Sequence, residues 1–367
     1  MKIVALRWIA LVGILGVAAP TTFGCKKETP ASKDDEKGDK KKSKGDDDDD
    51  DKGSKSSKKS KKGGDDDEAA TGGKYKSGDM LAHAPKKCDA GYMYMNVGAL
   101  LKSDAVASNA GALQDKLTDS MKGSKDSKKV AKVLKAMKKA GFDYSRDIKE
   151  FAVCAPSDWN APVVLAGGNF GDGFLKKMSK AIESVDEEDD VEDVKESDGV
   201  SYVKMKKKGV LAQVSDNVLA AGDDKDAVFA LKKKGSAPDD WDVGKGRILA
   251  LKVVDKKKKD INVDATITES GDDYDFKVSM EFGGAQGEKF KENPAAIQTE
   301  FEKQRDMIAA KIRKTPFKAL ADDIEKTKIK VDGSKFSFSV KVPSAHLAQA
   351  IKAASESSGD DLQGIFK

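Results

Sequence analysis

Apolar residues recur with a regular period only beyond about residue 75. In the first half of this region, short apolar runs bounded by turn residues predict strands, and apolar residues three or four apart predict helices. The predicted strands are 92–97, 151–154, 163–166, 201–205, 210–214 and 218–221. The predicted helices are 113–121 and 130–137, as two helices or one broken helix, and 174–182 and 225–233.

The second half follows the same plan. Apolar and polar residues alternate strictly from Tyr274 to Phe282, which predicts an antiparallel strand with one buried face and one wet face. The other predicted strands are 248–254, 263–267, 329–331 and 336–342, and the predicted helices are 297–312, 317–324 and 345–354.

We therefore expect an α+β fold, with mainly antiparallel sheets and packed helices. A break rich in Gly, Ser and Pro at 235–238 divides the two halves. Because strand groups followed by helices occur in both halves, we predict two similar α+β subdomains, 74–236 and 237–355, and a polar tail, 356–367.

Residues 26–73 consist mostly of Lys, Asp, Ser and Gly. With almost no apolar side chain to bury, nothing offsets the entropy lost on ordering this tract, so we predict a disordered tether. Its acidic block, Asp46 to Asp51, lacks the spaced pattern and central glycine of a dedicated calcium loop. A solvated spacer explains the charge blocks better than binding to calcium or anionic lipid headgroups.

Charge is balanced along the chain. The 67 basic and 63 acidic residues leave a net charge of +4 over 367 residues. A nucleic-acid-binding protein would show a basic excess on one face, whereas the lysines at 256–259 lie between Asp255 and Asp260. The sequence therefore indicates a protein that does not bind nucleic acid.

The first 25 residues have the features of an export signal. Lys2 and Arg7 make the start positive, and the apolar stretch at 8–19 is too short to span a bilayer in the mature protein. Cleavage after Ala19 would place Pro20 directly after the cut, which is unfavourable. We expect cleavage before Cys25.

This segment resembles the bacterial lipoprotein signal, in which an aliphatic residue and two small residues precede the cysteine that becomes diacylated. Gly24 and Cys25 match that pattern, whereas Thr22 and Phe23 depart from it. The resemblance implies a signal peptide at 1–24, a lipid on Cys25 and a tether at 25–73. An uncleaved N-terminal anchor helix is the alternative.

The resemblance also bears on the membrane to which the protein is anchored. Lys26 follows the cysteine, instead of the aspartate that resembles an inner-membrane retention signal, so we expect the outer membrane. Whether the protein faces the periplasm or the exterior stays open.

Cys88 and Cys154 remain as an even pair once Cys25 is assigned to the lipid. In an exported protein such a pair favours a disulfide if the strands that hold the two residues are neighbours. Two buried reduced thiols are the alternative.

Catalytic signals are sparse. The chain has two histidines, His83 in a predicted loop and His346 on the last predicted helix. It contains neither a Gly-x-Ser-x-Gly elbow nor a zinc-ligand spacing. We interpret both histidines as surface or structural residues, and the sequence identifies no catalytic, cofactor-binding or metal-binding residue.

A glycine-rich stretch at 167–173 lies between a predicted strand and a predicted helix, where backbone amides can hold a phosphate. Phe174 and Leu175 follow it, instead of the Lys and hydroxyl residue of a phosphate-binding loop. A strand end and a helix capped by Asp172 explain the same residues.

The sequence thus predicts a lipid-anchored envelope protein that works without a cofactor as a non-enzymatic binding or structural module. Its partners would be the membrane, through the anchor, and an envelope protein or ligand. The alternatives are a carrier that holds lipid or another hydrophobic ligand between sheet and helices, and an enzyme with an unrecognised site.

Overall fold

The computed structural model describes residues 75–109, 138, 141–156, 159, 161–171, 173–183, 193–204, 209–235, 238, 241, 243–254 and 261–356. Cys25, the predicted tether and the two helices predicted at 113–121 and 130–137 lie outside these residues, as does Asp172.

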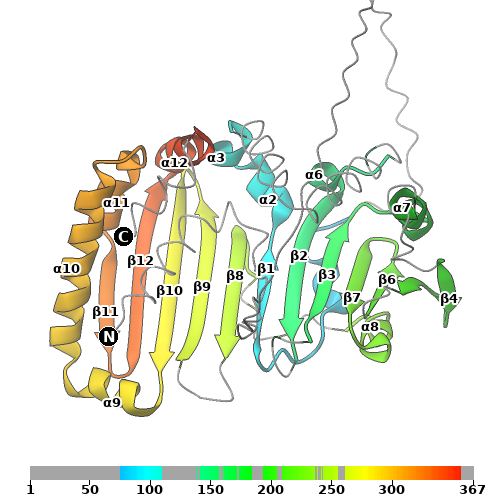
Figure 1. The fold of residues 1–367 in the computed structure, drawn as a ribbon, viewed down its shortest axis with the longest axis horizontal. Coiled ribbons are helices and arrows are strands. Elements are labelled where there is room, and N and C mark those ends of the chain that lie inside the picture. The colour runs from blue at the N-terminus through cyan, green and yellow to red at the C-terminus, as the bar shows by residue number, and fades with distance from the viewer. Residues whose placement is uncertain are drawn as a thin grey trace, which may run out of the picture. The chain divides into compact units, whose positions relative to one another are not determined.

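The described strands form one antiparallel twelve-stranded sheet, in the order β11-β12-β10-β9-β8-β1-β2-β3-β7-β6-β5-β4 (Figure 1). They are β1 Gly91–Met95, β2 Ile148–Ala155, β3 Val163–Gly168, β4 Lys195–Ser197, β5 Val200–Lys204, β6 Val210–Ser215, β7 Val218–Gly222, β8 Arg247–Val254, β9 Ile261–Ser270, β10 Asp273–Phe282, β11 Lys328–Asp332 and β12 Lys335–Pro343. The predicted α+β class with antiparallel sheet is confirmed.

Helices connect the strands and pack beside the sheet. They are η1 Asp79–His83, α2 Val97–Lys102, α3 Asp104–Ala107, α6 Tyr144–Asp147, α7 Phe174–Glu183, α8 Lys225–Ala230, α9 Gly284–Glu292, α10 Pro294–Ile312, η3 Lys318–Leu320, α11 Ala321–Glu325 and α12 Ser344–Glu356. Within the described part of the chain, no helix is long and apolar enough to cross a membrane.

Most predicted elements occur, but their ends differ. The strand predicted at 92–97 ends at Met95, because the Asn96 side chain accepts a hydrogen bond from the Ala99 amide and begins α2. The prediction missed α9, which contains three glycine or alanine residues in its first four positions and buries Phe290.

The register of the sheet gathers apolar side chains on one face. Because directly opposite residues of paired strands point to the same side, one row of them crosses every strand except β4. From β11 to β5 the row is Ile329, Phe338, Val278, Ala265, Leu251, Met93, Val153, Val164, Ala221, Leu211 and Val203. We call the side of the sheet that carries this row the apolar face.

The opposite side differs between the two halves of the sheet. In β1 to β3 and β5 to β7 it is apolar and buried, with Tyr94, Ala152 and Leu165 in a core that also contains Met80 and Val228 from the covering helices η1 and α8. In β9 to β12 it is polar, as in the row Thr266, Lys277, Ser339 and Lys328. The core of the protein therefore lies on both sides of the sheet in the first half and on the apolar face in the second half.

Candidate functional site

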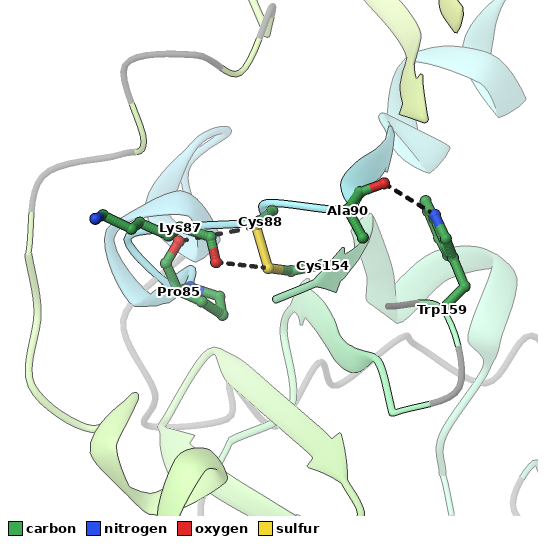
Figure 2. The surroundings of a disulfide bond; sticks show 6 residues. All are labelled: Pro85, Lys87, Cys88, Ala90, Cys154 and Trp159. Atoms are coloured by element: carbon green, nitrogen blue, oxygen red, sulfur yellow. Dashed lines mark hydrogen bonds between the residues drawn. A yellow bond between two sulfur atoms is a disulfide. The ribbon is translucent and has the colours of Figure 1, made fainter. Parts of the chain in front are cut away.

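A disulfide joins Cys88, before β1, to Cys154 in β2, with an S–S distance of 2.04 Å (Figure 2). The sequence left open whether these residues form a disulfide or remain two buried reduced thiols, and in the structure they form the disulfide. Strand β1 pairs with β2, and Tyr92 lies opposite Cys154, which brings the chain before β1 to the end of β2. Closing a loop across 66 residues stabilises the folded state by about 4 kcal/mol in the chain-entropy model.

The disulfide ends a segment that we call the strap, residues 75–88. The strap includes η1 and packs over the sheet as part of its main core, with Met80 fully buried. Carbonyl oxygens of Pro85 and Lys87 lie 3.9 and 3.6 Å from the disulfide sulfurs (Figure 2). The strap is thus a continuous covering of the sheet that ends at a covalent bond.

Glu150, in β2, is fully buried beneath the strap. Its Oε2 accepts a hydrogen bond from the Tyr75 hydroxyl at 2.5 Å, and its Oε1 accepts one from the Tyr94 hydroxyl at 2.9 Å. The Ser77 hydroxyl also donates to Oε1, and the Gly78 amide lies 3.0 Å from both oxygens. Such a set of donors offsets the cost of removing a carboxylate from water.

The two phenols remain protonated because of this surrounding. Burial raises the pKa of Tyr75 and of Tyr94, and the adjacent Glu150 carboxylate raises both further. Both hydroxyls can therefore donate to Glu150 over the physiological pH range. Since three of the five groups belong to the strap, the cluster fastens this segment to the sheet.

Gly167 and Gly168, the start of the glycine-rich stretch, lie in β3 next to this cluster. A Cβ atom on Gly167 would lie 2.3 Å from the Tyr75 hydroxyl oxygen, and one on Gly168 would lie 2.0 Å from the Asp147 carbonyl oxygen. The absence of side chains thus leaves room for Tyr75 and for the neighbouring backbone. Helix α7 begins at Phe174, after the stretch.

The two histidines occupy different surroundings. The prediction of a loop at His83 is wrong, because this residue ends η1 and is buried, with Nδ1 2.7 Å from the Leu231 carbonyl oxygen. Burial lowers its pKa, so the ring stays neutral and Nδ1–H is the donor. His346, in α12, contacts the buried Asp323 carboxylate at 2.7 Å. Hydrogen bonding within the fold accounts for both contacts without a catalytic role for either histidine.

The apolar face is a second candidate site. Helices cover its ends. The centroid of the Phe301 ring, in α10, lies 4.3 Å from that of the Phe336 ring in β12, and Phe174 of α7 belongs to a cluster with Leu219 in β7. Between these ends, large apolar side chains in the row are only half-buried. They are Phe338, Val278, Leu251, Met93, Val153 and Val164. Apolar side chains that stay partly exposed along a strip can serve as a binding surface.

Among the described residues, no group of three or more His, Cys, Asp or Glu side chains is placed so that it could hold a metal ion. Trp159 is partly exposed and donates from Nε1 to the Ala90 carbonyl oxygen at 3.0 Å, whereas Trp241 is buried and stacks on Tyr92 with ring centroids 4.6 Å apart. The Glu150 cluster was missed from the sequence, since its members are distant in the chain and each is a common residue.

No protein family model and no curated protein matches the chain. Among solved structures, it is similar to crystal forms III, I and IV of TP0453, with TM-scores of 0.42, 0.38 and 0.42 and sequence identities of 10%, 10% and 9%. The alignments cover 75%, 76% and 74% of this chain and 98%, 98% and 96% of those chains. At these values, nothing about TP0453 transfers to this protein.

Proposed function

We propose that this protein is a bacterial envelope lipoprotein, anchored through Cys25 to the outer membrane, that works by binding and not by catalysis. The apolar face is its binding surface. The observation that supports this proposal is the partly exposed row from Phe338 to Val164, which crosses the middle of the sheet. Apolar surface of this kind gains about 25 cal/mol for each Å² that a ligand covers.

The chemistry of the row favours a hydrophobic ligand such as a lipid acyl chain. Binding such a ligand is the carrier function that the alternating strands predicted. Six neighbouring strand spacings of about 4.8 Å separate Phe338 from Val164, so the row is about 29 Å long. None of its members has a polar side-chain atom. An apolar chain laid across the strands would lose no hydrogen bond on this surface.

A matched pair of variants tests the apolar face. Val278→Gln places an amide in the row, whereas Lys277→Gln makes the same residue at the next position, on the opposite and exposed side of β10. We expect lipid extracted from the purified protein and measured by mass spectrometry to fall about fivefold for Val278→Gln, from a loss of about 1 kcal/mol. Lys277→Gln should match the wild type.

Two other results would redirect the proposal. If wild type holds no lipid but crosslinks to an envelope protein, and Val278→Gln alone loses that partner, the face binds protein. If both variants behave as wild type in lipid content and in crosslinking, the apolar face is not the binding surface. Circular dichroism and thermal unfolding show whether either variant has lost its fold.

We further infer that the two halves are duplicated α+β units, as the sequence predicted. In the first half, the neighbouring strands β1, β2 and β3, with α2, α3 and α6 between β1 and β2, are followed by α7 and by strands that return so that β7 pairs with β3. In the second, β8-β9-β10 is followed by α9 to α11, and β12 returns to pair with β10. Helices α8 and α12 then end the two halves, and β1 pairs with β8 between them.

The duplication predicts that the halves recognise each other. Residues 1–236 and 237–367, coexpressed as separate chains, should associate through the β1·β8 pairing and elute together on size exclusion, with thiol crosslinking between Met93→Cys and Leu251→Cys. If the two chains fold but elute separately, the β1·β8 pairing does not hold the halves together. If one half folds and the other aggregates, the halves are not equivalent α+β units.

A further inference from the structure

The strap is held to the sheet mainly by side chains. The Tyr75 amide donates to Asn169 Oδ1 at 3.0 Å, Glu150 accepts from Tyr75, Ser77 and Gly78, and the ring of His83 contacts the Leu231 carbonyl oxygen. One backbone bond, from the Gly235 amide to the Ala82 carbonyl at 2.7 Å, adds to these contacts. By contrast, β1 lies between β2 and β8 and is paired with both along its whole length.

The direction of the chain decides how these contacts would bear a load. The segment N-terminal to Tyr75 is the one that leads to Cys25, so a pull from a membrane anchor reaches Tyr75 first. It then reaches Ser77 and Gly78, then η1, and Cys88 last. Contacts loaded one after another separate at lower force than a set of strand pairs loaded together, and opening one segment locally requires less free energy than unfolding the whole sheet.

The disulfide lies where such opening would have to stop. Cys88 is bonded to Cys154, near the end of β2, a strand paired on both sides by β1 and β3. Tension that has detached residues 75–87 would divide at Cys88 between the S–S bond to Cys154 in β2 and the backbone that leads to β1 at Gly91. The disulfide therefore keeps β1 from being loaded alone.

We propose that the strap is an extensible clasp between the membrane tether and the sheet. Under tension on the tether, residues 75–87 detach from Glu150 and its neighbours, add a contour length of about 45 Å to the tether, and uncover the part of the core that contains Tyr94 and Leu165. The Cys88–Cys154 bond sets the limit of this extension. The inference rests on the N-terminal anchor of the proposed function and is independent of what binds the apolar face.

Optical-tweezers extension of the full, unacylated protein tests the clasp, with one handle on the Cys25 thiol and the other on the C-terminus. Before the sheet unfolds, we expect a step equal to the released contour length of about 45 Å less the distance that the strap spans when folded. In the Cys88→Ser/Cys154→Ser protein the step should continue into β1 and be longer. The proposal is overturned if the oxidised sheet unfolds without an earlier step, or if the step has the same length with and without the disulfide.

Variants of the Glu150 cluster identify the contacts that resist the pull. Glu150→Gln should lower the force of the first step and leave the force for the sheet unchanged, whereas Tyr202→Phe, which removes a hydroxyl not bonded to Glu150, should change neither. Should Glu150→Gln not fold, Gly167→Ala displaces Tyr75 instead and should have the same effect. An unchanged first step in these cluster variants would refute the clasp. Because the handle replaces the lipid, failure of the anchor in cells would leave this result intact.

Discussion

Replacing Cys25 with alanine is expected to move the protein from the membrane fraction to the soluble fraction. Several acyl chains hold a protein firmly, since each buried methylene contributes about 0.8 kcal/mol, and this substitution removes their attachment point. Intact mass measures the same event: the wild type should begin at residue 25 and carry acyl chains.

The control is Thr22→Leu, which brings the segment closer to the lipoprotein signal and should leave fractionation unchanged or improve processing. An unmodified Cys25, together with a Cys25→Ala protein that stays in the membrane fraction, would contradict the proposed anchor. In that case, the apolar stretch at 8–19 would have to act as an uncleaved anchor helix or belong to a signal cleaved elsewhere.

Glu150→Ala is expected to lower the free energy of unfolding by about 3 to 5 kcal/mol. The substitution leaves the hydroxyls of Tyr75, Tyr94 and Ser77 and the Gly78 amide without their acceptor and creates a cavity in the core. Urea unfolding should show a lower midpoint with an unchanged slope, because the same surface is exposed on unfolding.

Glu196→Ala is the matched control, since this glutamate lies exposed on the edge strand β4. Its effect should stay within about 0.5 kcal/mol. Equal midpoints for the two variants would show that the buried cluster does not stabilise the fold. A further comparison with Glu150→Gln, which keeps the side-chain volume, separates the loss of an acceptor from the cavity.

The secondary structure of the second half follows closely from the sequence. Alternation of apolar and polar residues predicted β10 and β12 within two residues of their ends, because a strand with one buried face must repeat every second residue. The helix predicted at 297–312 became α10, which begins at Pro294, a residue that suits a first helical turn. Short elements such as β4 and α3 had too few residues to show a period.

That the strands of both halves join in a single sheet did not follow from the sequence. Pairing of β1 with β8 joins residues of the two predicted subdomains, and which strand ends meet depends on side chains distant in the chain. The partial exposure of the row on the apolar face has the same origin, since periodicity indicates that a side chain is apolar but not whether a helix covers it.

The sequence by itself determined the charged tract, the α+β class and the side of each long strand that is apolar, because these depend on composition and on local period, and the prediction of an export signal rests on the sequence alone. Only the tertiary structure decided that Cys88 and Cys154 are bonded, that Gly167 makes room for Tyr75, and that Glu150 is the buried acceptor of the strap. Each of these contacts joins residues more than 60 positions apart, where no local preference acts and the packing of the sheet alone sets the distance.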